Sequence, residues 1–570
     1  MKHLRIVGTV ALLIFFASAL CGQKNDYVWI FGYGSNPTDS TFGGSVIDFN
    51  ASPPNIYYKY IPMNMDATNA SICDDDGNLQ FYTNGIYAEN YLQAKVEGSD
   101  TLNPGIVSDN HYYFGYPLLQ GALILPPQSN DSIYSILHMN EVPSSQGLSY
   151  RATGLFHTLV DMRLNNYDGK VFVKSVPLVF DTLILSNLTA TRNSDGINWW
   201  VIIKEYNSHR FNKILYGPSG VELIEKQTIG SNPWGLDCLA SFSPDGTKYA
   251  EFCGGTLQSG KNLEIYDFNR CTGELSNPLW SHFFDGTYLA GLAFSPNSRF
   301  LYLSSGLYIY QFDLQADDVL ASKDTVAVYD GSASPFSTTF LTAQLAPDGR
   351  IYINSPNSSN TLHVIHHPDL KGDSCMVEQN GIQLPTYNAI SMPNFPNYRL
   401  GAIPPITPSF SHSTTGDTAF FQNTSINGVH FEWDFGDGTT GTGSVATHVY
   451  AQPGSYTVTL TVSDGCLSEV AVDTVAVVFT GAGERMEWDT GFVAYPNPAK
   501  NEITLSFEAR KGEGRLTVLD VFGRQIESRQ ILGNMVGLTL QTESWQNGIY
   551  FFRLIFDDES PSTRSIIISH

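Results

Sequence analysis

The stretch Leu239-Ala-Ser-Phe-Ser-Pro-Asp-Gly-Thr-Lys-Tyr249 decides the fold, because close variants of it recur further along the chain. Two variants are Leu292-Ala-Phe-Ser-Pro-Asn-Ser-Arg-Phe-Leu-Tyr302 and Ala343-Gln-Leu-Ala-Pro-Asp-Gly-Arg-Ile-Tyr352. Each copy is a short apolar run, a Pro-Asp or Pro-Asn turn and a second apolar run. Proline sets φ at the first turn position, and Asp-Gly or Asn tolerates the positive φ that follows. Each copy therefore predicts two antiparallel strands joined by a tight turn.

The spacing of the copies predicts a ring of similar units. The turn residues Asp245, Asn297 and Asp348 lie 52 and 51 residues apart. Weaker copies surround 75–77, 130–131 and 194–196, and third apolar strands follow at 263–267, 307–312 and 362–365. Such units are typical of propeller blades, and one blade cannot bury both of its faces alone. We therefore expect residues 24–402 to form a β-propeller of seven blades, with six or eight as alternatives. The repeats resemble the YVTN/WD-like propeller superfamily, although no Trp-Asp dipeptide closes each repeat.

A stiff Pro-rich linker at 403–409 opens a second unit, residues 403–480. In this unit Tyr456, Val458, Leu460 and Val462 alternate with polar residues, which predicts a half-buried strand. An earlier motif consists of Trp433, Asp434, Phe435, Gly436, Asp437 and Gly438. These residues resemble a PKD domain, which implies an immunoglobulin-like β-sandwich that acts as a spacer or as a protein or glycan contact.

Residues 490–570 read as a third β-rich unit with regular apolar alternation. Its motifs are Tyr495, Pro496, Asn497 and Pro498, then the turn Asp520-Val-Phe-Gly-Arg524, then Gly548, Ile549 and Tyr550. Together they resemble the type A sorting domain of the Bacteroidetes type IX secretion system, with Arg564 where the family often has Lys. The resemblance implies a β-sandwich that the secretion machinery recognises, and a protein that is secreted or displayed on the outer cell surface after passage through the periplasm.

The opposite end reads as an export signal, residues 1–22. Lys2 and Arg5 precede the apolar run Val7–Leu20, which is too short to span a bilayer comfortably, and cleavage before Gln23 is expected. Lipidation at Cys21 is the alternative, although Leu20 fits that signal poorly. No later stretch predicts a membrane helix. With a net charge of −24 we do not expect nucleic-acid binding, because an acidic surface repels phosphate backbones.

The cysteines predict one disulfide. Cys238 and Cys253 flank the turn 243–246 almost symmetrically, so antiparallel strands would bring them face to face. Cys466 has no partner inside its own unit and either stays free or pairs elsewhere. No CxxC pair is present, so neither a zinc ribbon nor a thioredoxin-like site is supported.

No catalytic fingerprint appears: GxSxG, HExxH, the P-loop and a complete GxGxxG are absent from the sequence. The acidic runs Asp74-Asp-Asp-Gly-Asn78 and Asp434 with Asp437 could bind calcium, but turn chemistry explains both better, so no cofactor is expected. His366-His367 is an unfavourable metal pair, because adjacent strand residues point to opposite faces. The aromatic runs Tyr57-Tyr58, Tyr112-Tyr113-Phe114 and Trp199-Trp200 could stack on sugar rings, but we expect them to lie in the blade core.

Two functions remain open for the body of the chain. In the first, the propeller is a binding or adhesion module for an extracellular protein or glycan. In the second, it is a hydrolase or lyase acting on extracellular glycans or peptides, with a site assembled from several blades that leaves no motif in the sequence. The absence of catalytic motifs favours the first. Clustered His, Asp, Glu or Arg side chains at one channel mouth would favour the second.

Overall fold

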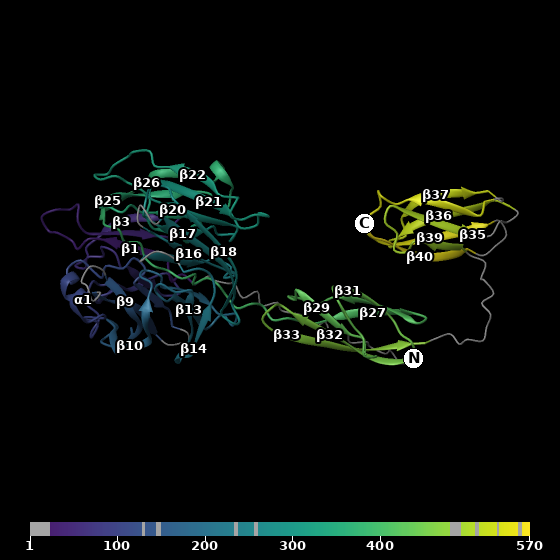
Figure 1. Cartoon of the computed structure of the whole chain (residues 1–570), viewed down its shortest axis with the longest axis horizontal. Helices are drawn as coiled ribbons and strands as arrows, with labels where there is room; N and C mark the ends of the chain where they lie inside the picture. Colours follow the sequence, from purple (N-terminus) through teal and green to yellow (C-terminus); the bar gives the residue numbers. More distant parts are fainter. Residues whose placement is uncertain are drawn as a thin grey trace, which may run out of the picture. The chain divides into compact units, whose positions relative to one another are not determined.

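The computed structural model describes residues 23–570 except 128–131, 144–149, 233–236, 256–259, 479–491, 508–511, 533–534 and 557–560. The predicted export signal and the weak turn at Asn130-Asp131 lie outside the described residues. Strands dominate the described chain and helix is almost absent, so the all-β prediction is confirmed (Figure 1). The sheets form three groups, which are described in turn.

Seven antiparallel sheets lie within residues 28–388 of the described chain, which matches the expected seven blades. The first three blades contain β1 (Val28–Gly32), β2 (Gly44–Asp48), β3 (Asn55–Lys59); β4 (Ala70–Cys73), β5 (Leu79–Thr83), β6 (Ala88–Asn90); and β7 (Ala122–Leu125), β8 (Ile133–Pro143), β9 (Tyr150–Asp161), β10 (Lys170–Leu183). Blades 4 and 5 contain β11 (Thr189–Arg192), β12 (Trp199–Lys204), β13 (Arg210–Gly217), β14 (Gly220–Thr228); and β15 (Cys238–Phe242), β16 (Lys248–Cys253), β17 (Lys261–Asn269), β18 (Glu274–Phe283). Blades 6 and 7 contain β19 (Gly291–Phe294), β20 (Phe300–Ser305), β21 (Tyr308–Asp313), β22 (Asp324–Val328); and β23 (Ala343–Leu345), β24 (Ile351–Ile353), β25 (Ser359–Ile365), β26 (Val377–Asn388). Two short helices, α1 (Ile106–His111) and η1 (Gly372–Cys375), lie between strands.

The repeated turn joins the first two strands of a blade, as its chemistry predicts. Between β15 and β16, Asp245 accepts a hydrogen bond from the Thr247 amide (3.0 Å), and Gly246 has a φ of 72°. The next copy places Ser298 at a φ of 60° without glycine, so that position carries some strain. These turns lie at one end of the blades, and the loops that precede each first strand lie at the other.

The first strands of neighbouring blades contact one another, as β15 does with β11 and β19, and so surround the centre of the ring. Aromatic packing closes the ring between the first and last blades. The Trp29 ring lies 5.6 Å from the ring of Tyr352, and the Ser45 and Thr386 hydroxyls are 2.7 Å apart. Burial of these rings stabilises the closure by the hydrophobic effect.

The second group of sheets is a β-sandwich. One sheet pairs β27 (Phe410–Thr415), β28 (Thr418–Asn423) and β31 (Val445–Val449), and the other pairs β30 (Thr440–Thr442), β29 (His430–Asp434), β32 (Gly454–Ser463) and β33 (Ser468–Val477). Trp433 is 1% exposed and its ring meets that of Phe410 edge to face at 5.2 Å. Val458, Leu460 and Val462 are fully buried, so the predicted apolar face of that strand is correct.

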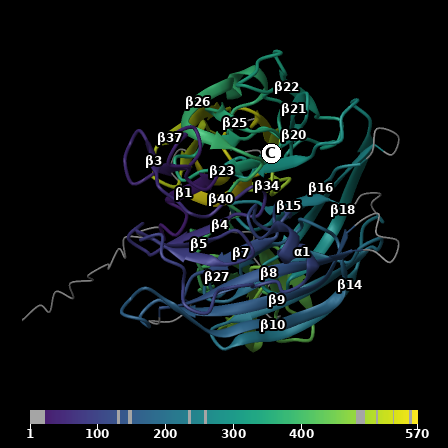
Figure 2. The ribbon, with the colours of Figure 1, turned by 90° about the vertical axis from the view of Figure 1, so that its left-hand side faces the viewer.

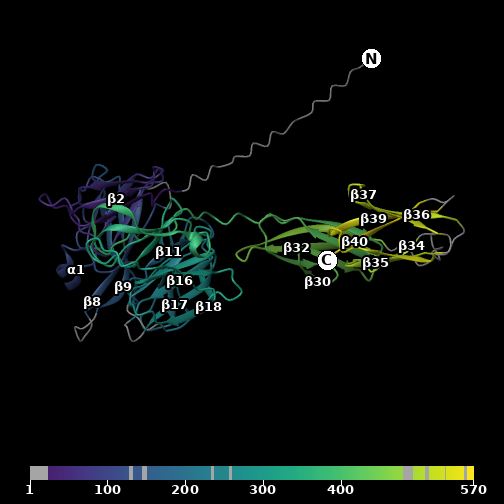
Figure 3. The same cartoon turned by 90° about the horizontal axis from the view of Figure 1, so that it is seen from above.

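The third group is a separate β-sandwich, shown in yellow in Figure 3. One sheet pairs β34 (Phe492–Tyr495), β35 (Glu502–Phe507) and β38 (Gly537–Gln541), and the other pairs β37 (Gln525–Ile531), β36 (Gly514–Asp520), β39 (Gly548–Phe556) and β40 (Ser562–Ile568). Alternate residues such as Leu516, Val518, Phe552 and Leu554 are buried, which gives this unit its own core.

Candidate functional site

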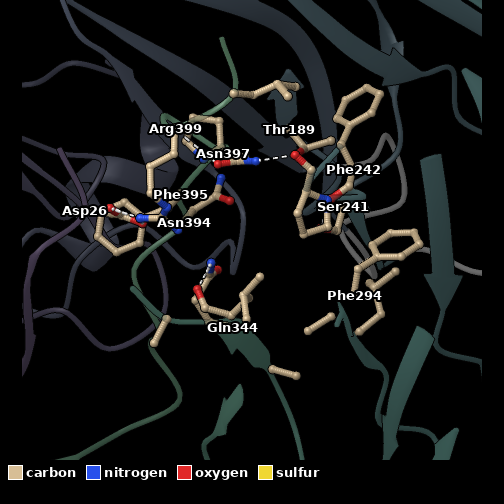
Figure 4. A pocket seen from close by; sticks show the side chains of 18 of the residues that line it. Asp26, Thr189, Ser241, Phe242, Phe294, Gln344, Asn394, Phe395, Asn397 and Arg399 are labelled. Carbon is tan, nitrogen blue, oxygen red and sulfur yellow. Dashed lines mark hydrogen bonds and ion pairs between the residues drawn. The ribbon is translucent and has the colours of Figure 1, made fainter. Parts of the chain in front are cut away.

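A cavity of about 350 Å³ lies in the propeller channel (Figure 4). The first strands of blades 4 to 7 line it, because residues of β11, β15, β19 and β23 all face it. The turn prolines Pro244, Pro296 and Pro347 also line it, so the cavity lies toward the end of the channel where the repeated turns gather. Its volume lies within the range of about 300–1,000 Å³ that is typical of small-ligand sites.

The remaining wall comes from residues 391–400, here called the channel segment. Asn394 donates from its side chain to the carbonyls of Ala122 (2.9 Å) and Leu188 (3.0 Å), and Tyr398 donates to the Ile124 carbonyl (2.7 Å). These bonds fix the segment against blades 3 and 4. Sequence reasoning assigned these residues only to the end of the propeller; their two prolines and buried Phe395 and Tyr398 were the available signal.

One ion pair lies at the cavity wall. The Arg399 guanidinium donates from Nη1 to both carboxylate oxygens of Asp26, at 2.5 and 2.6 Å. Burial raises the pKa of Asp26, and Arg399 acts in the opposite direction. The pair therefore offers a ligand little net charge, and it also ties the first described residues to the end of the propeller chain.

The other polar groups of the wall are neutral. Figure 4 places Phe242 and Phe294 on one side of the cavity and Phe395 on the opposite side. Within the described residues the Gln344 amide donates to a single acceptor, the carbonyl of its neighbour Leu345 (3.2 Å), so it keeps hydrogen-bonding capacity for a ligand. Apolar rings with amide and hydroxyl groups suit an uncharged polar ligand.

A second polar cluster is buried between blades 4 and 5, outside the lining of the channel cavity. Lys204, at the end of β12, forms ion pairs with Glu251 and with Glu264 (2.9 Å). The Tyr266 hydroxyl and the Ser231 amide donate to Glu264, and all three charged side chains are 2% exposed or less. Burial raises the pKa of Glu251. Because each charge has a partner, the cluster is a structural network.

Glu141 lies at the end of β8. It is 8% exposed, and its Oε2 has no hydrogen-bond partner within the described chain. Burial, with a smaller contribution from the Asp237 carboxylate, raises the pKa of Glu141 to about 8. The side chain is therefore largely protonated at neutral pH, as a general acid would be.

The structure joins Cys238 to Cys253 in a disulfide across β15 and β16, where the two residues are direct cross-strand partners. Cys466, which has no partner in its own unit, is joined to Cys271. Cys73 and Cys375 are buried thiols.

The sandwich motif residues form a turn between β29 and β30. Asp434 accepts from the Gly436 amide (2.9 Å), and Asp437 accepts from the Thr439 amide (3.0 Å) and pairs with His448 (2.7 Å). Gly436 and Gly438 have φ values of 80° and 93°, and the Phe435 ring is buried and stacks on His448 at 4.4 Å. Both carboxylates are thus engaged in turn contacts. Asp74 likewise accepts from the amides of Asp76 (3.1 Å) and Asn78 (2.8 Å).

The motif residues of the third unit lie around β40. The Asn497 side chain accepts from the Ile567 amide (2.8 Å), and Tyr550 is 6% exposed with its hydroxyl donating to the Gln546 carbonyl (2.9 Å). Asp520 accepts from the Arg524 amide (2.9 Å) and closes the hairpin before β37. Tyr495 and Ile549 are exposed, and the prolines Pro496 and Pro498 follow β34, while Gly548 opens β39.

His366 pairs with Glu378 (2.7 Å), and no group of three or more potential ligands in the described residues is placed to hold a metal ion. Among those residues no helix is both long and apolar enough to cross a membrane.

The aromatic runs separate into two classes. Trp199 and Trp200 are buried in the blades, as predicted. The assignment of the other two runs to the core is wrong, because Tyr58 is 45%, Tyr113 77% and Phe114 54% exposed. Tyr58 lies on an outermost strand and Tyr113 in a loop, so no neighbouring blade covers them.

Comparison with known proteins identifies two of the three units. The family model described as a PKD domain matches residues 405–478, and the model described as a secretion system C-terminal sorting domain matches residues 493–569. No curated protein sequence matches the chain.

Among solved structures, the PKD1 domain of the Vibrio cholerae metalloprotease PrtV is 39% identical over 12% of this chain and 93% of its own, with a TM-score of 0.12. A protein from Lactobacillus plantarum is 14% identical over 64% of this chain and 99% of its own (TM-score 0.37). The Dos1 propeller is 11% identical over 64% of this chain and 86% of its own (TM-score 0.37). The chain thus carries a PKD domain and a type IX secretion sorting domain, which indicates transport to the cell surface or beyond.

Proposed function

We propose that this protein is an extracellular binding protein whose propeller holds an uncharged polar ligand, a glycan unit or a neutral peptide segment, in the channel cavity. The PKD domain then acts as a spacer or an additional contact. The observation that carries the proposal is the composition of the cavity wall, which consists of aromatic rings, amides and hydroxyls. Its two charged groups, Asp26 and Arg399, form an ion pair and so neutralise each other.

The charge of the whole chain supports an uncharged ligand. A net charge of −24 repels anionic glycans, and the cavity offers no unpaired cation within its described lining. Gln344 offers an amide with remaining hydrogen-bonding capacity in the same cavity wall as Phe294. Amide hydrogen bonds combined with ring contacts are the usual means of orienting a neutral ligand in an apolar pocket.

The test is a screen of the chain from residue 23 onward against arrays of uncharged oligosaccharides and of peptides. A ligand found there is titrated against Gln344→Ala, which removes one amide and should weaken binding by about 3- to 10-fold. Gln315→Ala removes the same amide at an exposed position outside the cavity and should leave the affinity unchanged. An array without a ligand, or equal affinities for both variants, contradicts the proposal.

Glu141 supports the second candidate, a glycan or peptide hydrolase or lyase. Its raised pKa and its vacant Oε2 suit a general acid near the Asp237 carboxylate. Under this alternative the wild-type chain cleaves a polysaccharide or peptide of the same panels, and Glu141→Gln abolishes the cleavage while leaving binding intact. Products formed equally by both proteins would exclude Glu141 as the acid.

A further inference from the structure

The exposed aromatic side chains of blades 1 and 2 form a second surface, separate from the channel cavity. We define the tyrosine face as Tyr58, Tyr60, Tyr112, Tyr113 and Phe114, whose exposed fractions run from 37% to 77%. Soluble proteins rarely leave several large rings together in water without a partner for them. The tyrosine face is therefore a candidate interaction surface.

Hydrogen bonds join the segments that carry these residues. The Tyr58 hydroxyl donates to Ser35 (3.2 Å), and the amide of Gly34 beside it donates to the Asn64 side chain (2.8 Å). The same Asn64 side chain donates to the Tyr113 carbonyl at 2.5 Å. Residues from the β1–β2 loop, the segment after β3 and the loop after α1 are thus tied together.

The rings are held in place before any ligand arrives. The Asp66 amide donates to the Phe114 carbonyl (3.0 Å), and the rings of Tyr112 and Tyr113 meet edge to face at 5.5 Å. A fixed backbone and rigid rings lose little conformational entropy when a ligand binds. The face is preorganised for contact.

The tyrosine face lies at the opposite end of the propeller from the channel cavity. Asp66 and Phe114 belong to loops that precede the first strands β4 and β7, whereas the cavity is lined by turns that follow first strands in other blades. The helix α1, directly before Tyr112, lies on the side that faces the viewer in Figure 2. A ligand on this face therefore does not depend on the cavity.

The balance of charge around the tyrosine face favours an uncharged ligand. Lys95 contacts the Tyr112 hydroxyl (3.3 Å) and is neutralised by Asp100 (2.5 Å). The remaining chemistry is flat apolar rings with hydroxyl groups at their edges, and the hydroxyls of Tyr60 and Tyr113 make no hydrogen bond to any residue in the described chain. This combination matches a pyranose ring, which has an apolar C–H face and a polar rim. We propose that the tyrosine face binds an uncharged polysaccharide chain by ring stacking.

Affinity electrophoresis of the chain from residue 23 onward tests this proposal. The gels contain laminarin, mannan, dextran or hydroxyethyl cellulose as uncharged probes, and alginate or polygalacturonate as anionic probes. At least one uncharged polysaccharide should retard the wild type, with a dissociation constant that rises at least about tenfold in Tyr60→Ala/Tyr113→Ala.

Two controls separate the outcomes. Tyr167→Ala removes a ring that is 71% exposed in the β9–β10 turn and should keep full retardation. Gln344→Ala changes the channel cavity alone, so a probe whose retardation it weakens is bound there. Only a probe whose retardation falls in the double variant and not in Gln344→Ala supports the tyrosine face. The inference is overturned if no uncharged probe retards the protein, if only anionic probes do, or if the double variant is retarded like the wild type. The inference is also overturned if the wild type binds an immobilised protein but no polysaccharide, and the double variant loses that binding, because the face would then bind a protein.

Discussion

At the scale of single residues, the fold buries a few ionisable side chains whose charged form lowers its stability. Burial raises the pKa of Glu141 from its ordinary value of 4.5 to about 8. The folded chain therefore keeps a proton that the unfolded chain releases. The stability that this retained proton contributes is fully present below pH 4.5 and is lost as the pH rises through about 8.

Glu141→Gln removes this titration. As the pH rises from 5 to 9, the wild type should lose the stability that the Glu141 proton contributes, and the variant should not. We therefore expect the difference in unfolding free energy, variant minus wild type, to increase by about 2 to 4 kcal/mol over this range. Urea unfolding at both pH values measures the gap. A constant difference between the two proteins would show that Glu141 does not titrate in this window.

Lys204 is the opposite case, a buried cation that holds two carboxylates. Lys204→Met leaves Glu251 and Glu264 buried without their shared partner and should cost about 3 to 5 kcal/mol of unfolding free energy. Lys248→Met breaks the partly exposed pair with Asp267 and should cost about 1 kcal/mol or less. Equal losses in chemical denaturation would contradict a buried network.

At the scale of strands and turns, the sequence was informative where local chemistry and periodicity agree. The Pro-Asp turns placed the pairs β15–β16, β19–β20 and β23–β24, because such a turn allows few other connections. The channel segment was missed because it has no alternation and bonds through side chains to distant blades. The tyrosine face was misassigned, since a sequence pattern cannot tell an outer strand from a covered one.

The disulfide between β15 and β16 belongs to this scale. Cys238→Ser/Cys253→Ser opens a loop of 15 residues, for which chain entropy predicts a loss of about 3 kcal/mol. Chemical denaturation of this variant and of the wild type, both without reductant, measures this loss with the Cys271–Cys466 bond intact, and peptide mapping without reductant should recover Cys238 and Cys253 linked. Free thiols at both positions would remove the bond from the mature protein.

At the scale of the whole molecule, the units differ in how far their residues reveal their roles. The PKD and sorting units carry local motifs whose residues make turn and strand contacts, such as Asp437 with Thr439 and Asn497 with Ile567, so short patterns identify them. The propeller sites are assembled from residues hundreds of positions apart, as in Asp26 and Arg399, and no short pattern records such a meeting.

The sorting unit leads to a prediction about transport. Its strands enclose a core of their own, so we expect the secretion machinery to recognise a folded module and not a linear tag. A reporter with an export signal and residues 490–570 should reach the surface or the medium of a host with a type IX system, and should stay in the periplasm without them. Val518→Asp buries a carboxylate in that core and should trap the reporter, whereas Arg515→Asp puts the same group on an exposed position of the same strand and should not. Fractionation of the cells measures each case. If the Val518→Asp reporter is exported as well as the unaltered one, the machinery recognises a sequence motif, and the folded core is not required for recognition.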